Sequence, residues 1–131
     1  MSTATTITVS GDAGYDITVG RDILDLVGEA LAPTVHKVLI VHPPTLTQQA
    51  GELRDRLMAD GSRKVLLAEI PDAEAGKRIE VAAFCWQVMG QADFTRTDAV
   101  VGFGGGAVTD LAGFAAATWL RGVAVVQVPT T

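Results

Sequence analysis

Short, continuous apolar runs alternate with segments of helical spacing along most of this chain, and that alternation constrains the fold more than any other feature. Runs of four or five apolar residues that end at proline or glycine are typical of strands buried on both faces of a parallel sheet. Apolar residues three or four apart are typical of the helices that cover such a sheet. Strands are predicted at 37–41, 64–70, 98–103 and 123–129, and helices from about residues 21, 46, 79 and 107.

The first twenty residues follow a different pattern. Polar and apolar residues alternate in "TITVS" and "YDITVG", on either side of the turn residues of "GDAG", which predicts a β-hairpin. The predicted fold class is therefore α/β, a Rossmann-like parallel sheet with helices on both faces, opened by an N-terminal β-hairpin. The chain ends directly after a predicted strand, so we expect 1–131 to be one domain, the N-terminal part of a two-domain protein.

Composition limits the classes of partner. Hydrophobic residues make up 48% and charged residues 19%, as in a globular domain, and the net charge of -5 argues against a nucleic-acid partner. No apolar run is long enough to cross a membrane, and the first residues lack the pattern of a signal peptide. The one cysteine, Cys85, lies in an apolar helical segment and is predicted to be core. A cytoplasmic location is expected.

Three consecutive glycines, Gly104–Gly106, follow a predicted buried strand and precede a predicted helix. Ligands of α/β sheets bind at this place, where free backbone N–H groups at a helix start attract phosphate and glycine lets it approach. The stretch 102–107 also fits the G-x-G-x-x-G/A fingerprint, although no ribose-binding acid follows about twenty residues on. Asp110 has two interpretations, a first-turn acid that offsets the helix dipole or an acceptor for a sugar hydroxyl.

Other polar residues lie near predicted strand ends. The loop after Pro71 carries Asp72, Glu74 and Lys77, and it is either a solvated loop that caps the next helix or part of the same site. Thr130 and Thr131 close the last strand, where two hydroxyls could reach a ligand or simply be strand residues.

The histidines give no metal site. His36 and His42 lie at opposite ends of one predicted strand, roughly 20 Å apart at roughly 3.3 Å per residue, so they cannot share a metal. We interpret both as strand-edge residues and predict no metal ligand in this chain.

Three stretches in this order and spacing, "PDAEAGK", "GFGGGAVTDLAGFAAATWLRGV" and "VQVPTT", resemble the N-terminal domain of the 3-dehydroquinate synthase family. The resemblance implies conversion of 3-deoxy-D-arabino-heptulosonate 7-phosphate to 3-dehydroquinate and phosphate in the shikimate pathway. It also implies NAD, a divalent metal (zinc or cobalt), a small phosphorylated substrate and a homodimer. The glycine segment is shared with glycerol and iron-dependent alcohol dehydrogenases.

The resemblance also implies roles for individual residues. Arg121 resembles the arginine that reaches the substrate phosphate, with a dimer interface as one route. The metal ligands and the substrate-binding lysines of the family lie in a C-terminal domain, so the 131 residues alone are expected to be inactive. The implied cofactor-binding residues are Asp72, Glu74, Lys77, Gly105, Gly106, Ala107, Val108, Thr109, Asp110, Thr130 and Thr131.

Two positions depart from the family pattern, and other functions stay open. Ala107 stands where valine is more frequent, and His42 stands at a strand end that often offers an acid or amide to the adenosine ribose. The alternatives are a related sugar-phosphate cyclase, a metal-dependent polyol dehydrogenase, and a nucleotide-binding module without enzymatic activity.

Overall fold

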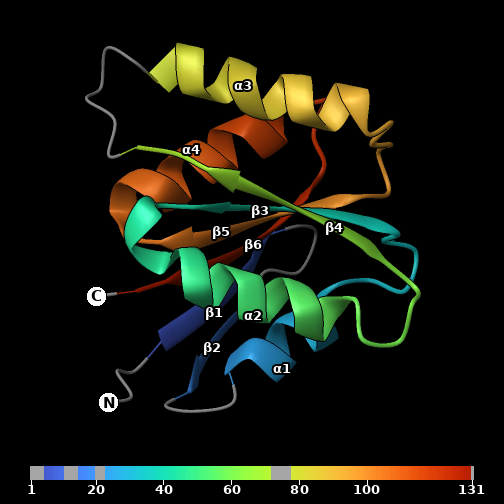
Figure 1. Ribbon diagram of the computed structural model, residues 1–131, viewed down its shortest axis with the longest axis vertical. Helices are drawn as coiled ribbons and strands as arrows, with labels where there is room; N and C mark the ends of the chain where they lie inside the picture. The colour runs from blue at the N-terminus through green and yellow to red at the C-terminus, as the bar shows by residue number, and fades with distance from the viewer. Residues whose placement is uncertain (1–4, 11–14, 20–22, 72–77, 131) are drawn as a thin grey trace.

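A six-stranded sheet lies between two layers of helices in the computed structural model, which describes residues 5–10, 15–19, 23–71 and 78–130 (Figure 1). Each predicted strand and helix is present, with ends that differ from the prediction by a few residues at most. The elements are β1 (Thr5–Ser10), β2 (Tyr15–Val19), α1 (Ile23–Ala30), β3 (Lys37–His42), the 3-10 turn η1 (Pro44–Leu46), α2 (Thr47–Leu57), β4 (Lys64–Glu69), α3 (Arg78–Gln91), β5 (Ala99–Gly104), α4 (Gly106–Thr118) and β6 (Ala124–Pro129).

The strand order in the sheet is β2-β1-β6-β5-β3-β4. The four strands β6, β5, β3 and β4 are parallel, and β1 pairs antiparallel with both β6 and β2. After β3 the chain first moves outward to β4, then returns across β3 to β5 and continues to β6. The direction of winding therefore reverses between β3 and β5. The prediction of an α/β fold opened by a hairpin is confirmed, and the hairpin extends the edge of the same sheet.

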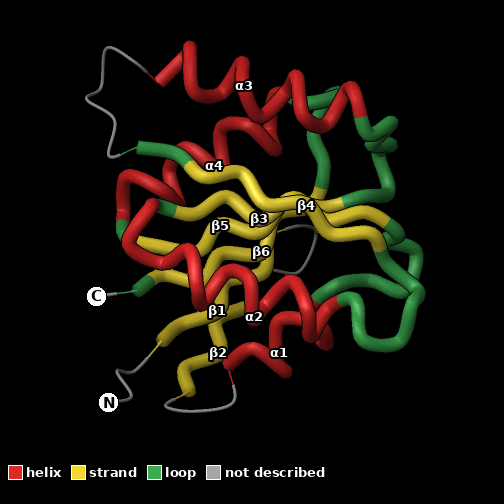
Figure 2. The backbone as a smooth tube through the Cα atoms, in the orientation of Figure 1, coloured by secondary structure: helices red, strands yellow, loops and turns green. Residues whose placement is uncertain are grey.

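Helices cover both faces of the parallel strands, as Figure 2 shows. The strands β3 and β5 alternate their side chains between the two layers: Val101 and Phe103 pack with α1 and α2, whereas Val100 packs with α3 and α4. Cys85 is fully buried in the α3–α4 layer, and burial raises the pKa of its thiol to about 11. The prediction that Cys85 is core is confirmed. No helix in the described ranges is long and apolar enough to cross a membrane.

A buried carboxylate fastens the amino-terminal ends of β3 and β5. Asp98 is 2% exposed, and its two oxygens accept hydrogen bonds from the backbone N–H groups of Lys37 (2.9 Å), Thr95 (2.8 Å) and His36 (3.2 Å). Burial opposes the charge, but the N–H donors of Thr95, Lys37 and His36 outweigh it and hold the pKa of Asp98 below its ordinary value.

We expect Asp98→Asn to destabilise the protein by about 1–3 kcal/mol at neutral pH, because an amide N–H₂ would face backbone N–H donors. A lowered pKa in the folded state stabilises it above the ordinary pKa of 3.8, and this contribution is lost as the pH falls through the folded-state pKa. Urea unfolding of both proteins between neutral pH and pH 3 measures the difference. A difference in stability that stays constant over this range would contradict the assignment.

Candidate functional site

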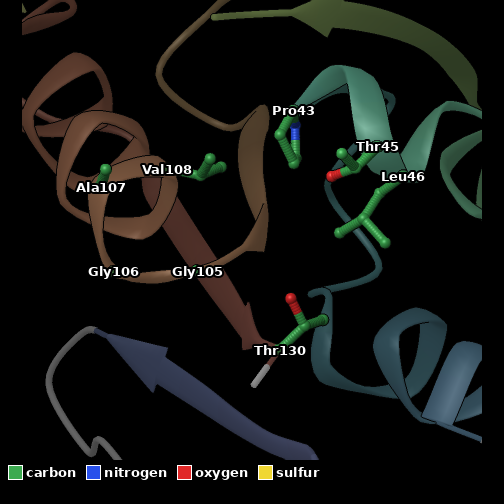
Figure 3. A pocket seen from close by; sticks show the side chains of 8 residues that line it. All are labelled: Pro43, Thr45, Leu46, Gly105, Gly106, Ala107, Val108 and Thr130. Carbon is green, nitrogen blue, oxygen red and sulfur yellow. The ribbon is translucent and has the colours of Figure 1, made fainter. Parts of the chain in front are cut away.

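A cavity of about 340 Å³ opens at the carboxyl ends of β3, β5 and β6. It lies where the strand order reverses, the place at which open α/β sheets bind ligands because the loops after the two strands diverge there. One wall is the turn after β3 and the other is the loop that leads from β5 into α4, as Figure 3 shows. The lining residues are Pro43, Thr45, Leu46, Gly105, Gly106, Ala107, Val108 and Thr130.

The three consecutive glycines serve two different purposes. A Cβ atom built at Gly105 or at Gly106 would meet no heavy atom within 4 Å, so both residues leave open space beside the backbone. A Cβ atom at Gly104 would lie 3.0 Å from both Pro43 Cδ and Val108 Cβ. Gly104 is therefore required by internal packing, which corrects the expectation that the whole triplet serves ligand approach.

The start of α4 offers backbone donors to the cavity. Gly105 is the N-cap residue of α4, with extended backbone angles and no side-chain hydrogen bond to cap the helix. The first N–H groups of a helix have no partner within the helix and carry partial positive charge, so an uncapped start suits an anion. In Figure 3 the hydroxyl of Thr130 also points toward the cavity.

Not every predicted site residue reaches this cavity. Gly105, Gly106, Ala107, Val108 and Thr130 line it together. Of the remaining predicted residues, Thr109 and Asp110 lie further along α4 and outside the lining, and Asp72, Glu74, Lys77 and Thr131 lie outside the described residues.

Three hydrogen bonds hold the glycine loop in place. The hydroxyl of Thr109 donates back to the carbonyl oxygens of Gly105 and Gly106 at 3.3 Å and 3.2 Å. The backbone N–H of Thr130 donates to the carbonyl of Gly104 at 2.8 Å. The bond from Thr130 joins the end of β6 to the start of the glycine loop, so that Thr130 and the loop keep one relative position.

Arg121 lies near the opposite, amino-terminal end of the parallel strands. It precedes β6 whereas Thr130 follows it, and the six residues of the strand separate them by roughly 20 Å. Arg121 is exposed, and both Leu120 and Arg121 have positive φ angles, 47° and 70°. The structure therefore does not bring Arg121 to the glycine loop of the same chain.

Sequence reasoning missed the wall formed by Pro43, Thr45 and Leu46. The available signal was "HPPT" directly after a buried strand, but only the strand order shows that this turn faces the glycine loop. His42 is 1% exposed, and its Nδ1 atom lies 2.9 Å from the carbonyl oxygen of Pro43. It ends β3, as predicted, but its ring lies in the interior and does not line the cavity.

A metal centre does not form among the residues that the structure describes. No group of three or more His, Cys, Asp or Glu side chains in these ranges could hold a metal ion. The described cavity is therefore a site of backbone donors and hydroxyl groups, suited to a phosphorylated or hydroxylated ligand.

The fold closely resembles those of solved enzymes. A 2-deoxy-scyllo-inosose synthase solved with carbaglucose-6-phosphate, NAD+ and Co2+ matches 95% of this chain and 35% of its own, with a TM-score of 0.77 and 19% identity. A 2-epi-5-epi-valiolone synthase from Streptomyces hygroscopicus subsp. jinggangensis 5008, solved with NAD+ and Zn2+, gives a TM-score of 0.65 and 25% identity over 87% of this chain and 32% of its own. The fold of this chain is therefore that of an α/β domain that makes up about a third of these larger enzymes.

Sequence comparison narrows this class. The family described as "3-dehydroquinate synthase N-terminal" matches residues 67–131. A 3-dehydroquinate synthase from Leifsonia xyli subsp. xyli (strain CTCB07) is 62% identical over 97% of this chain and 35% of its own length. One from Paenarthrobacter aurescens (strain TC1) is 56% identical over 98% of this chain and 36% of its own. The chain belongs to the 3-dehydroquinate synthase family, and it spans about a third of the length of the curated relatives it matches.

The different surroundings of the adjacent glycines predict different costs for the same substitution. We expect Gly104→Ala to destabilise the protein by about 1–3 kcal/mol, because its methyl group would press on Pro43 and Val108. Gly105→Ala meets open space and an ordinary φ of -76°, and it loses less than about 1 kcal/mol of N-cap preference. Thermal unfolding of the two variants measures both values. Equal losses would show that the two glycines share one role.

Proposed function

We propose that this chain is the NAD-binding part of a 3-dehydroquinate synthase. The complete enzyme would convert 3-deoxy-D-arabino-heptulosonate 7-phosphate to 3-dehydroquinate and phosphate. The observation that carries the proposal is the bare backbone of Gly105 and Gly106 at the uncapped start of α4, facing a cavity at the switch point of the sheet.

The cavity suits the diphosphate of a dinucleotide. A negatively charged ligand must be held by local groups, since the chain as a whole carries a net charge of -5. The start of α4 supplies such groups as backbone N–H donors, and glycine at 105 and 106 lets phosphate oxygens come within hydrogen-bond distance. Solved neighbours that share this fold were crystallised with NAD+, which supports the same cofactor here.

Individual roles follow from position in the loop. Gly105 to Val108 would hold the diphosphate through the backbone, and the hydroxyl of Thr130 would contact the cofactor from the end of β6. Asp110, one turn into α4, would accept a hydrogen bond from a ribose hydroxyl. We also assign to the cofactor, on family resemblance, the residues Thr109, Asp72, Glu74, Lys77 and Thr131.

The cofactor and the metal supply the difficult chemistry. NAD, when bound, supplies reversible acceptance of hydride, and the protein supplies placement and exclusion of water. Because the described residues contain no set of metal ligands, we assign the zinc or cobalt ion to residues outside them. The site on this chain therefore acts by binding and orientation.

Arg121 is proposed to bind the substrate phosphate in a homodimer. Its guanidinium group presents donors in a fork that matches phosphate oxygens. Since Arg121 and the glycine loop lie at opposite ends of β6, the sheet separates the arginine from the cavity of its own subunit. In a homodimer, the Arg121 of a second subunit would reach the site instead. A cytoplasmic location completes the proposal.

Identity favours the synthase over the other cyclases. The 3-dehydroquinate synthase relatives are 48% to 62% identical to this chain, whereas the solved cyclases are 19% to 25% identical. Phosphate release from 3-deoxy-D-arabino-heptulosonate 7-phosphate by the complete enzyme, with other cyclase substrates as comparison, tests this choice.

We expect Gly105→Val to abolish NAD binding while the fold is kept, because its side chain would fill the space beside the loop that the diphosphate needs. Calorimetric titration of the complete enzyme with NAD, together with circular dichroism, measures both properties. Gly51→Val is the matched control: it lies on α2, where the nearest atom to an added Cβ is Arg54 Nη2 at 3.9 Å. Undiminished NAD binding by Gly105→Val would exclude this loop as the diphosphate site.

We expect Arg121→Lys to raise KM for the phosphorylated substrate at least tenfold, with little change in NAD affinity, because lysine cannot form the bidentate contact. Steady-state kinetics in the complete enzyme and NAD titration separate the two effects. Parallel losses in both, with a lower melting temperature, would show that Arg121 acts through packing alone.

A further inference from the structure

A polar side chain interrupts the apolar layer between the sheet and α4. Along β6, Val125 belongs to the core cluster on this face, and the next residue on the same face is Gln127. Val126 and Val128 belong to the cluster on the opposite face. The amide of Gln127 therefore stands where the alternation of the strand would place another core residue.

The contacts of Gln127 aim its amide at α4. Its Nε2 atom donates a hydrogen bond of 2.8 Å to the carbonyl oxygen of Thr109, in the first turns of the helix. This carbonyl can only accept, so the orientation of the amide is fixed. The other atom, Oε1, is buried and has no hydrogen-bond partner within the described part of the chain.

Two glycines leave the space that this side chain occupies. Gly102 pairs with Gln127 across the sheet, and a Cβ atom built on it would overlap Gln127 Oε1. On the helix side, a Cβ atom at Gly113 would lie 3.3 Å from Gln127 Nε2. Glycine residues on both the strand and the helix therefore leave room for the amide of Gln127.

Packing alone does not explain this choice of residue. A buried acceptor without a partner destabilises a fold, whereas an apolar side chain of the same length, such as methionine, would avoid that cost. What methionine could not do is hold the carbonyl of Thr109. The amide thus lowers the stability of the fold somewhat, but it fixes the position of the first turns of α4.

The strand β6 and Thr130, which follows it, hold the glycine loop on both sides. Thr130 bonds to the carbonyl of Gly104, immediately before the loop, and Gln127 bonds to the carbonyl of Thr109, immediately after it. The residues between these two anchors, 105–108, are those that line the cavity from this side.

We propose that Gln127 is a positioning residue that sets the glycine loop for the bound diphosphate by fastening the first turns of α4 to β6. The inference rests on the proposed NAD site but concerns a residue outside the cavity lining. Loss of the Gln127 side chain is expected to weaken the cofactor site without weakening the fold.

The test compares Gln127→Met with the wild type in the complete enzyme. We expect the Kd for NAD to rise about tenfold, as for the loss of one ordering hydrogen bond, while the melting temperature stays the same or rises. Amide hydrogen exchange in residues 109–113 is expected to become faster, whereas the exchange rates in α2 are expected to stay the same. A role in packing alone would lower the melting temperature and leave the Kd unchanged.

Thr118→Val is the matched control at the other end of the same helix. It removes a hydroxyl that accepts from Trp86 Nε1 at 3.0 Å and donates to the carbonyl of Phe114 at 2.6 Å. This variant should alter exchange near Phe114 and leave the Kd for NAD unchanged.

Each outcome decides one of the two proposals. An unchanged Kd in Gln127→Met, in an enzyme that binds NAD, overturns the positioning role and leaves the NAD site standing. A wild-type enzyme that fails to bind NAD removes the proposed function. In that case, unchanged exchange at residues 109–113 also overturns the positioning role, and faster exchange upholds the anchoring of the turn by Gln127.

Discussion

The close approach of α4 to β5 is the constraint on which the rest of the site depends. A Cβ atom at Gly102 would lie 2.8 Å from the Cβ atom of Ala112, so helix and strand come together through a glycine and an alanine. Ala115 and Ala116, one turn further along α4, are also small and are buried in the same core cluster. Because larger side chains would lift the helix from the sheet, these small residues fix where α4 begins, and with it the glycine loop.

The fold converts this packing into a site by bringing two distant segments together. The turn at 43–46 and the loop at 105–108 are sixty residues apart in the chain, yet they face each other because β3 and β5 are neighbours across the switch point. A bare glycine loop is costly, about 0.5–1 kcal/mol per residue in lost backbone entropy. Fixed anchors on both flanks confine this cost to the few residues that must stay open.

The helices and strands could be predicted from the sequence, but which of them lie side by side could not. Buried strands and amphipathic helices have local signatures, so the α/β fold, the hairpin and the glycine loop could be predicted. Strand order is set by contacts between residues far apart in the sequence, so the cavity wall at Pro43 could not be predicted. Gly104 and Gly105 are the same residue type, but Gly104 is closely packed and Gly105 faces open space. This difference does not appear in the sequence. A single Gln127 in an apolar strand gave no sign of its partner, because the Thr109 carbonyl belongs to another element.

The turn before β6 gives an independent physical reason to look beyond packing for Arg121. Leu120 and Arg121 both adopt left-handed backbone angles, at a cost of about 1–3 kcal/mol each, although a glycine follows immediately at 122. Both side chains remain exposed, Leu120 at 45%, so burial within this chain does not offset the strain. Two backbone hydrogen bonds close the turn, from the N–H of Gly122 to the carbonyl of Trp119 at 2.7 Å and from the N–H of Val123 to the carbonyl of Ala116 at 2.9 Å. These bonds hold the exposed Arg121 in a fixed place at the amino-terminal end of β6, which is the placement that the proposed phosphate contact between subunits requires.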